Sequence, residues 1–222
     1  TYDVTCTVTD AGGTDSMTKS FTDTRTAAPI TRMIVGSQGY CSRSTNNGAT
    51  WVAMTRGLNN GSVTSTISDI AYNGIAAVAG GGYASRSTDN GATWTALPQG
   101  LNSGSTSAYW NKVATNGTTW IAVANNGYAS RSTDDGATWT ALPQGLNSGL
   151  TTANLRGIAA NGSAWIAVAD TGYASRSTDD GVTWTALPQG LNNGSANANF
   201  NCVNTNKNTW ITTAQGAYVS RS

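Results

Sequence analysis

The sequence predicts an all-β fold, a β-propeller of about five four-stranded blades, and three observations lead to it. First, a segment of the type Gly-Tyr-x-Ser-Arg-Ser recurs, and its final serines (Ser44, Ser87, Ser132, Ser177 and Ser222) lie 43, 45, 45 and 45 residues apart. Second, apolar and polar residues alternate with period two inside each unit. Third, Asn-Gly and Asp-Gly pairs separate the alternating runs. Four antiparallel strands in about 45 residues are typical of a propeller blade.

The third unit shows the expected strands of one blade most clearly. We expect them at residues 109–114, 119–124, 128–132 and 138–142. The first three end at Gly117, Gly127 and Gly136, each preceded by Asn or Asp, and this pairing favours tight hairpin turns with positive φ. Pro143 follows the fourth strand, where a proline cannot continue a central ladder. Apolar residues at helical spacing do not occur, so we expect no helix.

The units at both ends of the array lack a strand. Counted from Ile30, the first unit has no obvious inner strand, and the last unit, completed by residues 217–222, has no outer strand. We expect five blades that close into a ring. Residues before Ile30 would either supply a strand, such as 18–24, or pack as a separate hairpin. An open arc would instead indicate a larger propeller or an assembly that covers the bare edge.

The composition excludes several classes of function. The 222 residues include 11 Asp but no Glu and no His, so the commonest general bases and metal ligands are missing. A net charge of +1 offers no basis for binding nucleic acid, and without a long apolar run we expect no membrane insertion. The three cysteines, Cys6, Cys41 and Cys202, are too far apart for a zinc motif, and their odd number leaves at least one outside any intrachain disulfide. We therefore expect no metal and no cofactor.

A second motif, Ser-x-Asp-x-Gly-x-Thr-Trp, lies between the third and fourth strands of the units. Its aspartate should accept backbone N–H groups, its glycine supplies a positive φ, and its tryptophan should pack under the hairpin. The motif resembles the Asp-box, or BNR, repeat of sialidase-like propellers, and the repeats cover residues 30–222. The paired positions are Asn46 and Trp51, Asp89 and Trp94, Asp134 and Trp139, and Asp179 and Trp184.

Sialidase activity is nevertheless not expected. The resemblance implies that such a site needs three arginines, a Tyr–Glu nucleophile pair and an acidic residue, and this chain has no Glu. Two aspartates acting on a glycoside would have to lie within about 5–10 Å of each other. Most of the aspartates fall in turns that the resemblance places at the rim, and Asp69, on a predicted inner strand, has no obvious partner. We therefore expect no catalytic residue and no enzyme.

For two sets of residues, a binding role is one of two interpretations. One arginine recurs at the same place in every unit: Arg43, Arg86, Arg131, Arg176 and Arg221. Together these arginines could form a ring that binds an anionic ligand, or each could brace the neighbouring blade. Their regular recurrence favours the brace. The units differ most in the connections between blades, where aromatic rings and amides suit a sugar. The candidate ligand face there consists of Trp110, Asn111, Arg156, Asn199 and Phe200. The alternative, which we favour for the aromatic rings, is that they fill the inner core.

Residues 1–29 do not match the repeat. Tyr2, Val4 and Val8 alternate with polar residues ahead of Gly12-Gly13. This pattern resembles the closing hairpin of a PKD-type immunoglobulin-like domain, although Cys6 stands where that pattern has Leu. We therefore divide the chain into a PKD-like hairpin with its linker at 1–29 and the propeller at 30–222.

The two resemblances together imply phage virion or tail proteins and secreted surface proteins. We expect a non-catalytic structural or adhesion module at an extracellular or virion surface, which binds or displays. Its expected partner is a surface glycan, a protein, or further copies in a virion or filament. Two alternatives remain open: a non-catalytic segment of a secreted carbohydrate-active enzyme, sialidase-like or another glycoside hydrolase, and an assembly-factor propeller that binds a protein.

Overall fold

The computed structural model describes residues 2–8, 17–23, 31–192, 197–215 and 219–221. Its strands form one N-terminal hairpin and five antiparallel sheets, which are the blades. The hairpin pairs β1 (Tyr2–Val8) with β2 (Met17–Asp23). A hairpin, rather than a strand lent to a blade, is one of the two arrangements that the sequence allowed for this segment.

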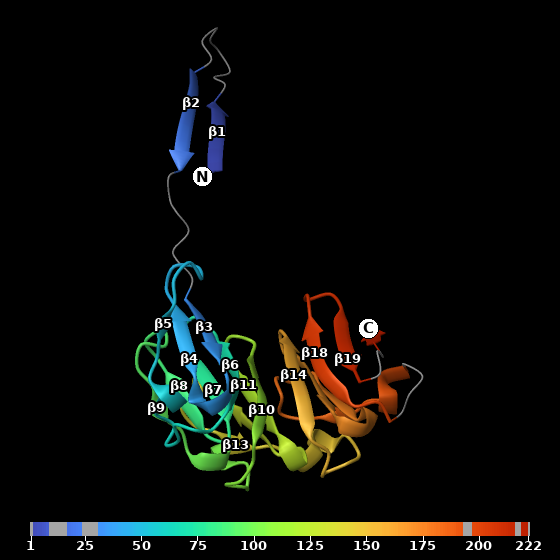
Figure 1. The fold of residues 1–222 in the computed structure, drawn as a ribbon. Coiled ribbons are helices and arrows are strands. Elements are labelled where there is room, and N and C mark those ends of the chain that lie inside the picture. The colour runs from blue at the N-terminus through green and yellow to red at the C-terminus, as the bar shows by residue number, and fades with distance from the viewer. Residues whose placement is uncertain (1, 9–16, 24–30, 193–196, 216–218, 222) are drawn as a thin grey trace.

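The strands of each blade pair in chain order (Figure 1). The first blade holds β3 (Arg32–Val35), β4 (Cys41–Ser44) and β5 (Val52–Ala53). The second holds β6 (Ile67–Tyr72), β7 (Ala77–Gly81), β8 (Ala84–Ser87) and β9 (Thr95–Ala96). The third holds β10 (Trp110–Thr115), β11 (Trp120–Ala124), β12 (Ala129–Ser132) and β13 (Thr140–Ala141). The fourth holds β14 (Leu155–Asn161), β15 (Ala164–Ala169), β16 (Ala174–Ser177) and β17 (Thr185–Ala186), and the fifth β18 (Phe200–Thr205), β19 (Trp210–Ala214) and β20 (Val219–Arg221).

Short 3-10 turns replace some of the simple turns that the sequence predicts. Three of these turns follow the second strand of a blade, a position that β3 takes in the first blade. They are η1 (Ser37–Gly39), η4 (Asn125–Gly127) and η6 (Asp170–Gly172). Those after the outermost strand are η2 (Arg56–Asn59), η3 (Gln99–Asn102), η5 (Gln144–Asn147) and η7 (Gln189–Asn192). All seven contain residues with positive φ, so they act as tight turns rather than as helices.

The hydrophobic core is divided among the interfaces between successive blades. Between the second and third blades, Val78 and Leu101 pack against Trp110, Trp120 and Trp139. Equivalent residues of the later units fill the next two interfaces, and a smaller cluster joins the first and second blades. Each blade is therefore held mainly by its neighbours in the chain, which is how repeat proteins bury their apolar surface.

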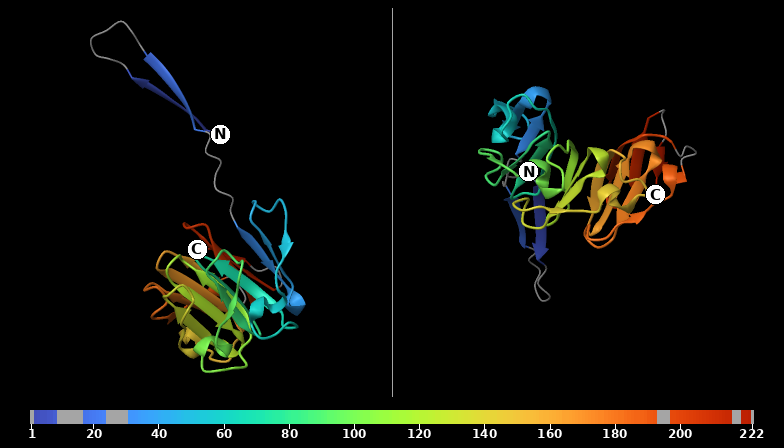
Figure 2. Two further views of the ribbon diagram at one scale, coloured as in Figure 1. Left: turned by 90° about the vertical axis from the view of Figure 1, so that its left-hand side faces the viewer. Right: turned by 90° about the horizontal axis from the view of Figure 1, so that it is seen from below.

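The predicted closure of the ring is wrong for this structure. The first and fifth blades lie at opposite ends of an open arc (Figures 1 and 2), and no elements of these two blades pack together among the described residues. The two end blades do have three strands each, as predicted. In the part of the chain that is described, one end blade has no inner strand and the other has no outer strand, so a single returning strand could not complete both blades.

The strands β6, β10, β14 and β18 pack side by side along the inner, concave surface of the arc. They bring residues from four blades to one surface. Within the described ranges, no helix is long and apolar enough to cross a membrane.

Candidate functional site

The aspartate turns, defined as residues 44–51, 87–94, 132–139 and 177–184, are held by their own side chains. In the third turn, Asp134 Oδ1 accepts hydrogen bonds from Thr138 N at 2.8 Å and from Ser132 Oγ at 2.7 Å. Trp139 Nε1 donates to Gly136 O at 2.9 Å, and the ring is buried. The N–H bonds and the buried tryptophans predicted for the second, third and fourth turns are thus present, whereas Trp51 of the first turn is 39% exposed. The same contacts recur around Asp89 with Trp94 and around Asp179 with Trp184.

These hydrogen bonds stabilise the ionised carboxylates. The Thr93 hydroxyl, followed by the Thr93 N–H, lowers the pKa of Asp89 to about 2. Thr183 lowers the pKa of Asp179 to about 2 in the same way. Burial raises the pKa of Asp134, but the hydrogen bonds of its turn outweigh burial and the net pKa is lowered. Such carboxylates are poor general acids at neutral pH, so their chemistry suits a structural role.

The recurrent arginines brace the next blade where their contacts are described. Arg86 Nε donates to Asp135 O at 2.6 Å, and Arg131 Nε donates to Asp180 O at 2.8 Å. Arg43 Nε is buried and has no acceptor among the described residues. Two arginines are therefore occupied by neighbouring backbone, which supports the brace over an anion-binding ring.

The aromatic residues of the candidate ligand face are not on a surface. Trp110 is 1% exposed and Phe200 is fully buried, and both pack between blades. Leu155 fills the same position in the fourth blade. The proposed ligand role of Trp110 and Phe200 is therefore wrong, because a buried ring offers no face on which a sugar could stack. The alternative, that these rings fill the core, is the correct one.

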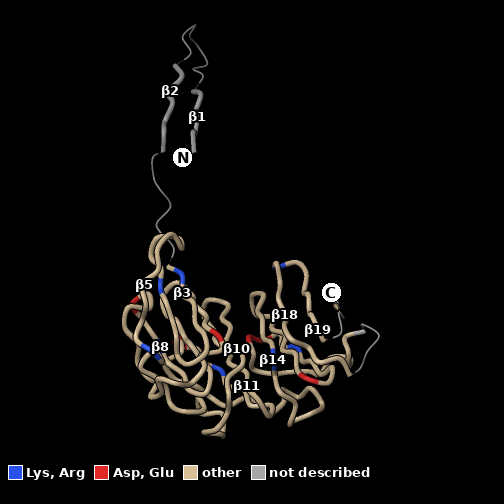
Figure 3. Tube along the Cα trace, viewed as in Figure 1, with Lys and Arg blue, Asp and Glu red and all other residues tan. Residues whose placement is uncertain are grey.

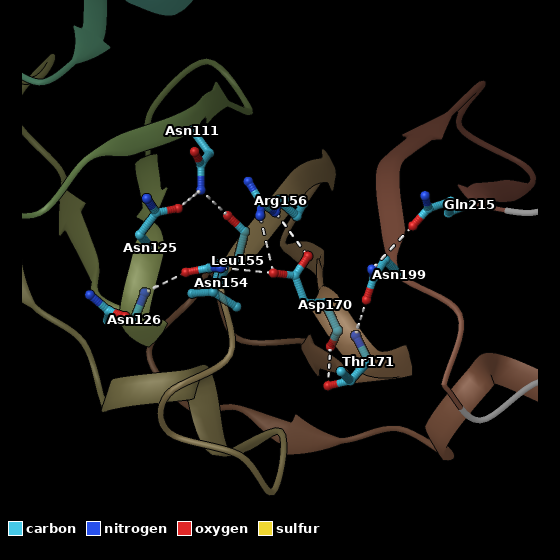
Figure 4. A network of polar contacts seen from close by, with 10 residues as sticks. All are labelled: Asn111, Asn125, Asn126, Asn154, Leu155, Arg156, Asp170, Thr171, Asn199 and Gln215. Atoms are coloured by element: carbon cyan, nitrogen blue, oxygen red, sulfur yellow. Dashed lines mark hydrogen bonds and ion pairs between the residues drawn. The ribbon is translucent and has the colours of Figure 1, made fainter.

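The polar residues of that face lie in a network across the third, fourth and fifth blades (Figure 4). Asn111 Nδ2 donates to Asn125 Oδ1 at 2.9 Å and to Leu155 O at 2.8 Å. Asn199 Oδ1 accepts a hydrogen bond from Thr171 N at 2.8 Å. Both asparagines connect neighbouring blades, so part of their hydrogen-bonding capacity is used by the fold.

Arg156 forms the charged centre of this network with Asp170 (Figure 4). Its Nε lies 2.9 Å from Asp170 Oδ1, and its terminal nitrogen lies 3.1 Å from Asp170 Oδ2. Asn154 donates to the same carboxylate at 2.8 Å and accepts a hydrogen bond from Asn126 N at 3.0 Å. The Arg156 side chain remains 40% exposed, so it can still contact a ligand.

Each inner strand contains a β-bulge at the position that Asn111 and Arg156 occupy in their blades. The strand register shifts between Ile67 and Asp69 in β6, and at the equivalent places in β10, β14 and β18. Bulges turn a side chain out of the regular alternation, and the sequence pattern did not reveal them. The residues at the shifts are called the bulge row: Ser68, Asn111, Arg156 and Asn201. They are half-buried, except for Asn201, which is exposed.

A groove of about 350 Å³ is lined by all four inner strands. The bulge-row residues are not part of its lining, but the residue that follows each of them in the chain is: Asp69, Lys112, Gly157 and Cys202. Asp69 lines the groove together with Lys112, whose Nζ lies 3.1 Å from Asp69 Oδ1. The N–H of Val113 donates to Asp69 Oδ2 at 3.0 Å. The sequence suggested no partner for Asp69; Lys112 is that partner, because neighbouring inner strands bring the two residues together.

Charge is sparse in the part of the chain that is described (Figure 3). The Asp69–Lys112 pair in the groove and the Arg156–Asp170 pair of the network each combine one positive and one negative charge. No group of three potential metal-ligating side chains gathers among the described residues. Cys41 and Cys202 are free thiols, and the Cys6 side chain lies outside the described part. The arrangement offers amides, hydroxyls and one guanidinium as hydrogen-bonding groups.

Comparison with known proteins establishes the fold. No family model and no curated protein matches the chain. A structure described as YCF48 bound to D1 peptide is 14% identical over 95% of this chain and 68% of that one, with a TM-score of 0.61. A GH74 xyloglucanase from Xanthomonas campestris is 14% identical over 82% of this chain but only 31% of its own, with a TM-score of 0.59.

A third similar structure is the extracellular domain of a hybrid two component system from B. thetaiotaomicron. It is 14% identical over 84% of this chain and 25% of that domain, with a TM-score of 0.61. The chain thus spans less than a third of the xyloglucanase and of this extracellular domain. Similarity at this level of identity concerns the fold alone: the chain is an all-β protein of the propeller type.

Proposed function

We propose that this chain is a non-catalytic structural or adhesion module that binds a neutral surface glycan at the bulge row and the adjoining groove. The proposal rests on the difference between the positions that recur in every unit and the positions that vary. Positions that recur in every unit form the turns and the braces between blades, whereas the bulge row holds three different residue types over four blades: Ser68, Asn111, Arg156 and Asn201. Side chains that vary on a constant scaffold are typical of a recognition surface. The Asp-box and PKD-like resemblances and the composition favour an extracellular or virion surface.

The contacts that the aspartates make within the fold support a non-catalytic role. Asp69 and Asp170 are in ion pairs, and three further aspartates hold the aspartate turns. Asp135 and Asp180 each accept a hydrogen bond from an asparagine of the preceding blade. These seven are all the aspartates between residues 31 and 215. Each one serves the fold, and hydrolysis of a glycoside would need two carboxylates that face the substrate.

The chemistry of the site favours a neutral, hydroxyl-rich ligand. Asn201 presents an exposed amide, which both donates and accepts hydrogen bonds, as sugar hydroxyls do. Asn111 donates both of its amide hydrogens within the fold and offers only its Oδ1 as an acceptor. Arg156 and Lys112 are paired with carboxylates, so the groove carries little net charge. A strongly anionic ligand would have to compete with those carboxylates.

The test is an array of neutral glycans, anionic glycans and short peptides, probed with the purified chain. Asn201 is exposed and its side chain has no hydrogen bond among the described residues, so Asn201→Ala should leave the fold intact. We expect it to weaken glycan binding about tenfold, the equivalent of one hydrogen bond. The matched control Asn208→Ala changes an exposed asparagine outside the bulge row and should bind like the wild type. Sugar release that Asp69→Asn abolishes would contradict the non-catalytic role.

A peptide is the second candidate ligand, since the YCF48 structure that matches nearly the whole chain has a bound peptide. Binding to the peptides of the array but to no glycan, with the same loss on Asn201→Ala, would select it. The similarity to a xyloglucanase favours the other alternative, a segment of a larger carbohydrate-active enzyme. Binding of glucan chains in preference to other glycans would support that alternative.

A further inference from the structure

Among the described residues, the faces at the two ends of the arc have no neighbouring blade. An inner blade packs one face on the preceding blade and the other on the following blade. The first blade leaves its preceding face open, and the fifth leaves its following face open. Large apolar side chains are exposed there: Ile34 (55%) and Trp51 (39%) on the first blade, and Ile211 (45%) and Val219 (59%) on the fifth.

Inside the arc, successive blades fit together by a repeated contact between a side chain and a glycine. The side chain comes from the second strand of one blade, and the glycine belongs to the aspartate turn of the next. A Cβ added to Gly136 would overlap Val78, and one added to Gly181 would overlap Ile121. The contact between the first two blades is Met33 against Gly91.

Gly48 on the first blade and Ile211 on the fifth are the two residues needed for one more contact of this kind. Gly48 is the glycine of the first aspartate turn, and an added Cβ would meet only side-chain atoms of Arg32 and Trp51 in its own blade, at 3.8 Å. Ile211 pairs with Arg221 across β19 and β20 as Ile121 pairs with its arginine across β11 and β12. Ile121 is fully buried, whereas Ile211 is exposed.

The polar contacts between blades are open at the same end. Arg131 braces the turn of the following blade, and Arg221, at the same place in its unit, is exposed. Asn116 Nδ2 donates to Gly162 O in the turn of the following blade at 2.8 Å. Asn206 holds the same position in its own turn, where its backbone N–H donates to Thr209 O. Neither its side-chain Nδ2 nor the Arg221 guanidinium has an acceptor among the described residues.

We propose that the fifth blade of one copy of this chain packs onto the first blade of a second copy, with Ile211 against Gly48 of the second copy. Three of the four interfaces inside the arc hold this contact and show that such faces are complementary. The polar groups of the fifth blade would meet backbone acceptors rather than charges. The contact is head-to-tail, so each copy keeps one face for a further copy. The proposal concerns self-association and is independent of the ligand proposed above.

The test uses two variants, each of which disrupts one of the two end faces of the arc. Ile34→Asp places a charge on the first blade, and Ile211→Asp places one on the fifth. The control, Ile75→Asp, changes an equally exposed residue (63%) of the second blade, away from both end faces. Sedimentation velocity over a concentration series then measures the mass of each protein.

The wild type and the control are expected to associate with rising concentration, while each end variant alone stays monomeric. An equimolar mixture of Ile34→Asp and Ile211→Asp should form dimers and nothing larger, because only one intact pair of faces exists in it. A wild type that is monomeric at every concentration overturns the proposal, whether the arc stays open or closes on itself. So does association that both end variants retain. If either variant fails to fold, Trp51→Asp and Val219→Asp provide a second pair of the same design.

Discussion

At the scale of single residues, the first aspartate turn shows that the turn needs an acceptor but not a charge. Asn46 Oδ1 accepts from Thr50 N at 2.9 Å, and Asn46 Nδ2 donates to Thr50 Oγ1 at 2.7 Å. In the second turn, Asp89 Oδ1 accepts from Thr93 N at 2.8 Å. Removal of an acceptor from a buried donor costs about 1–3 kcal/mol. The structure exposes Asp89, so the loss should be smaller.

The lowered pKa of Asp89 makes the stability of this turn depend on pH. An unfolded aspartate titrates near pH 3.9, and in the folded chain the pKa of Asp89 is about 2. Its contribution is therefore complete above about pH 4 and is lost as the pH falls through about 2. We expect Asp89→Asn, which copies Asn46, to reduce the change in unfolding free energy across this window. At pH 7 it should lower that free energy by no more than about 1 kcal/mol.

Urea denaturation at several pH values between 2 and 7 measures this effect. The reverse variant, Asn46→Asp, is the matched control and should steepen the pH dependence. Identical pH profiles for wild type and Asp89→Asn would show that the carboxylate is not linked to folding.

At the scale of elements, the connection that leaves each blade begins with a left-handed turn. Gly100, Leu101 and Asn102 have φ values of 74°, 43° and 53°. A leucine in this conformation is strained by about 1–2 kcal/mol. Its side chain is 1% exposed in the core between blades, where burial contributes about 1.5–3 kcal/mol. Packing between blades thus offsets the strain, which no local sequence signal would predict.

Two glycines of this connection should respond differently to substitution. An added Cβ at Gly100 would overlap the carbonyl oxygen of Ser105, whereas at Gly104, with φ of 91°, it would meet nothing within 4 Å. We expect Gly104→Ala to cost about 1–2 kcal/mol from backbone strain alone. Gly100→Ala should cost clearly more, about 4 kcal/mol or above. Chemical denaturation of the two variants provides the comparison, and equal losses would mean that the connection relaxes around the new methyl group.

At the scale of the whole molecule, the stability of the arc should be a sum over blades and the interfaces between them. The tryptophans of the aspartate turns report on this directly, because the four have the same local motif. Trp139 is 5% exposed because the preceding blade covers it. Trp51 belongs to the first blade, which has no preceding neighbour, and is correspondingly more exposed.

We therefore expect Trp139→Ala to lower the free energy of unfolding by about 3–5 kcal/mol and Trp51→Ala by clearly less. Both are measured by denaturant unfolding of dilute protein, in which copies do not associate. Equal losses would contradict the open arc, because they would require the first blade to be covered within a single chain.

The sequence by itself determined the all-β class, the five repeats, the three-stranded end units and the turns that hold the aspartates. These features depend on local signals: alternation along one strand, a glycine where φ is positive, an acceptor four residues before a backbone donor. The expected strands of the third blade accordingly agree with β10 to β13 within two residues at every end.

Only the tertiary structure decided the candidate site and the open arc. The pairing of Asp69 with Lys112 and the burial of Trp110 depend on neighbouring strands from different blades. The bulges beneath Asn111 and Arg156 depend on how two strands of one blade pair. The contacts join residues some 14 to 44 positions apart in the chain. Alternation within one strand shows that a side chain leaves one face of it, but not whether a groove or another blade lies there. Closure likewise depends on how far each blade turns relative to the last, and that angle is set by packing between side chains rather than by any one repeat.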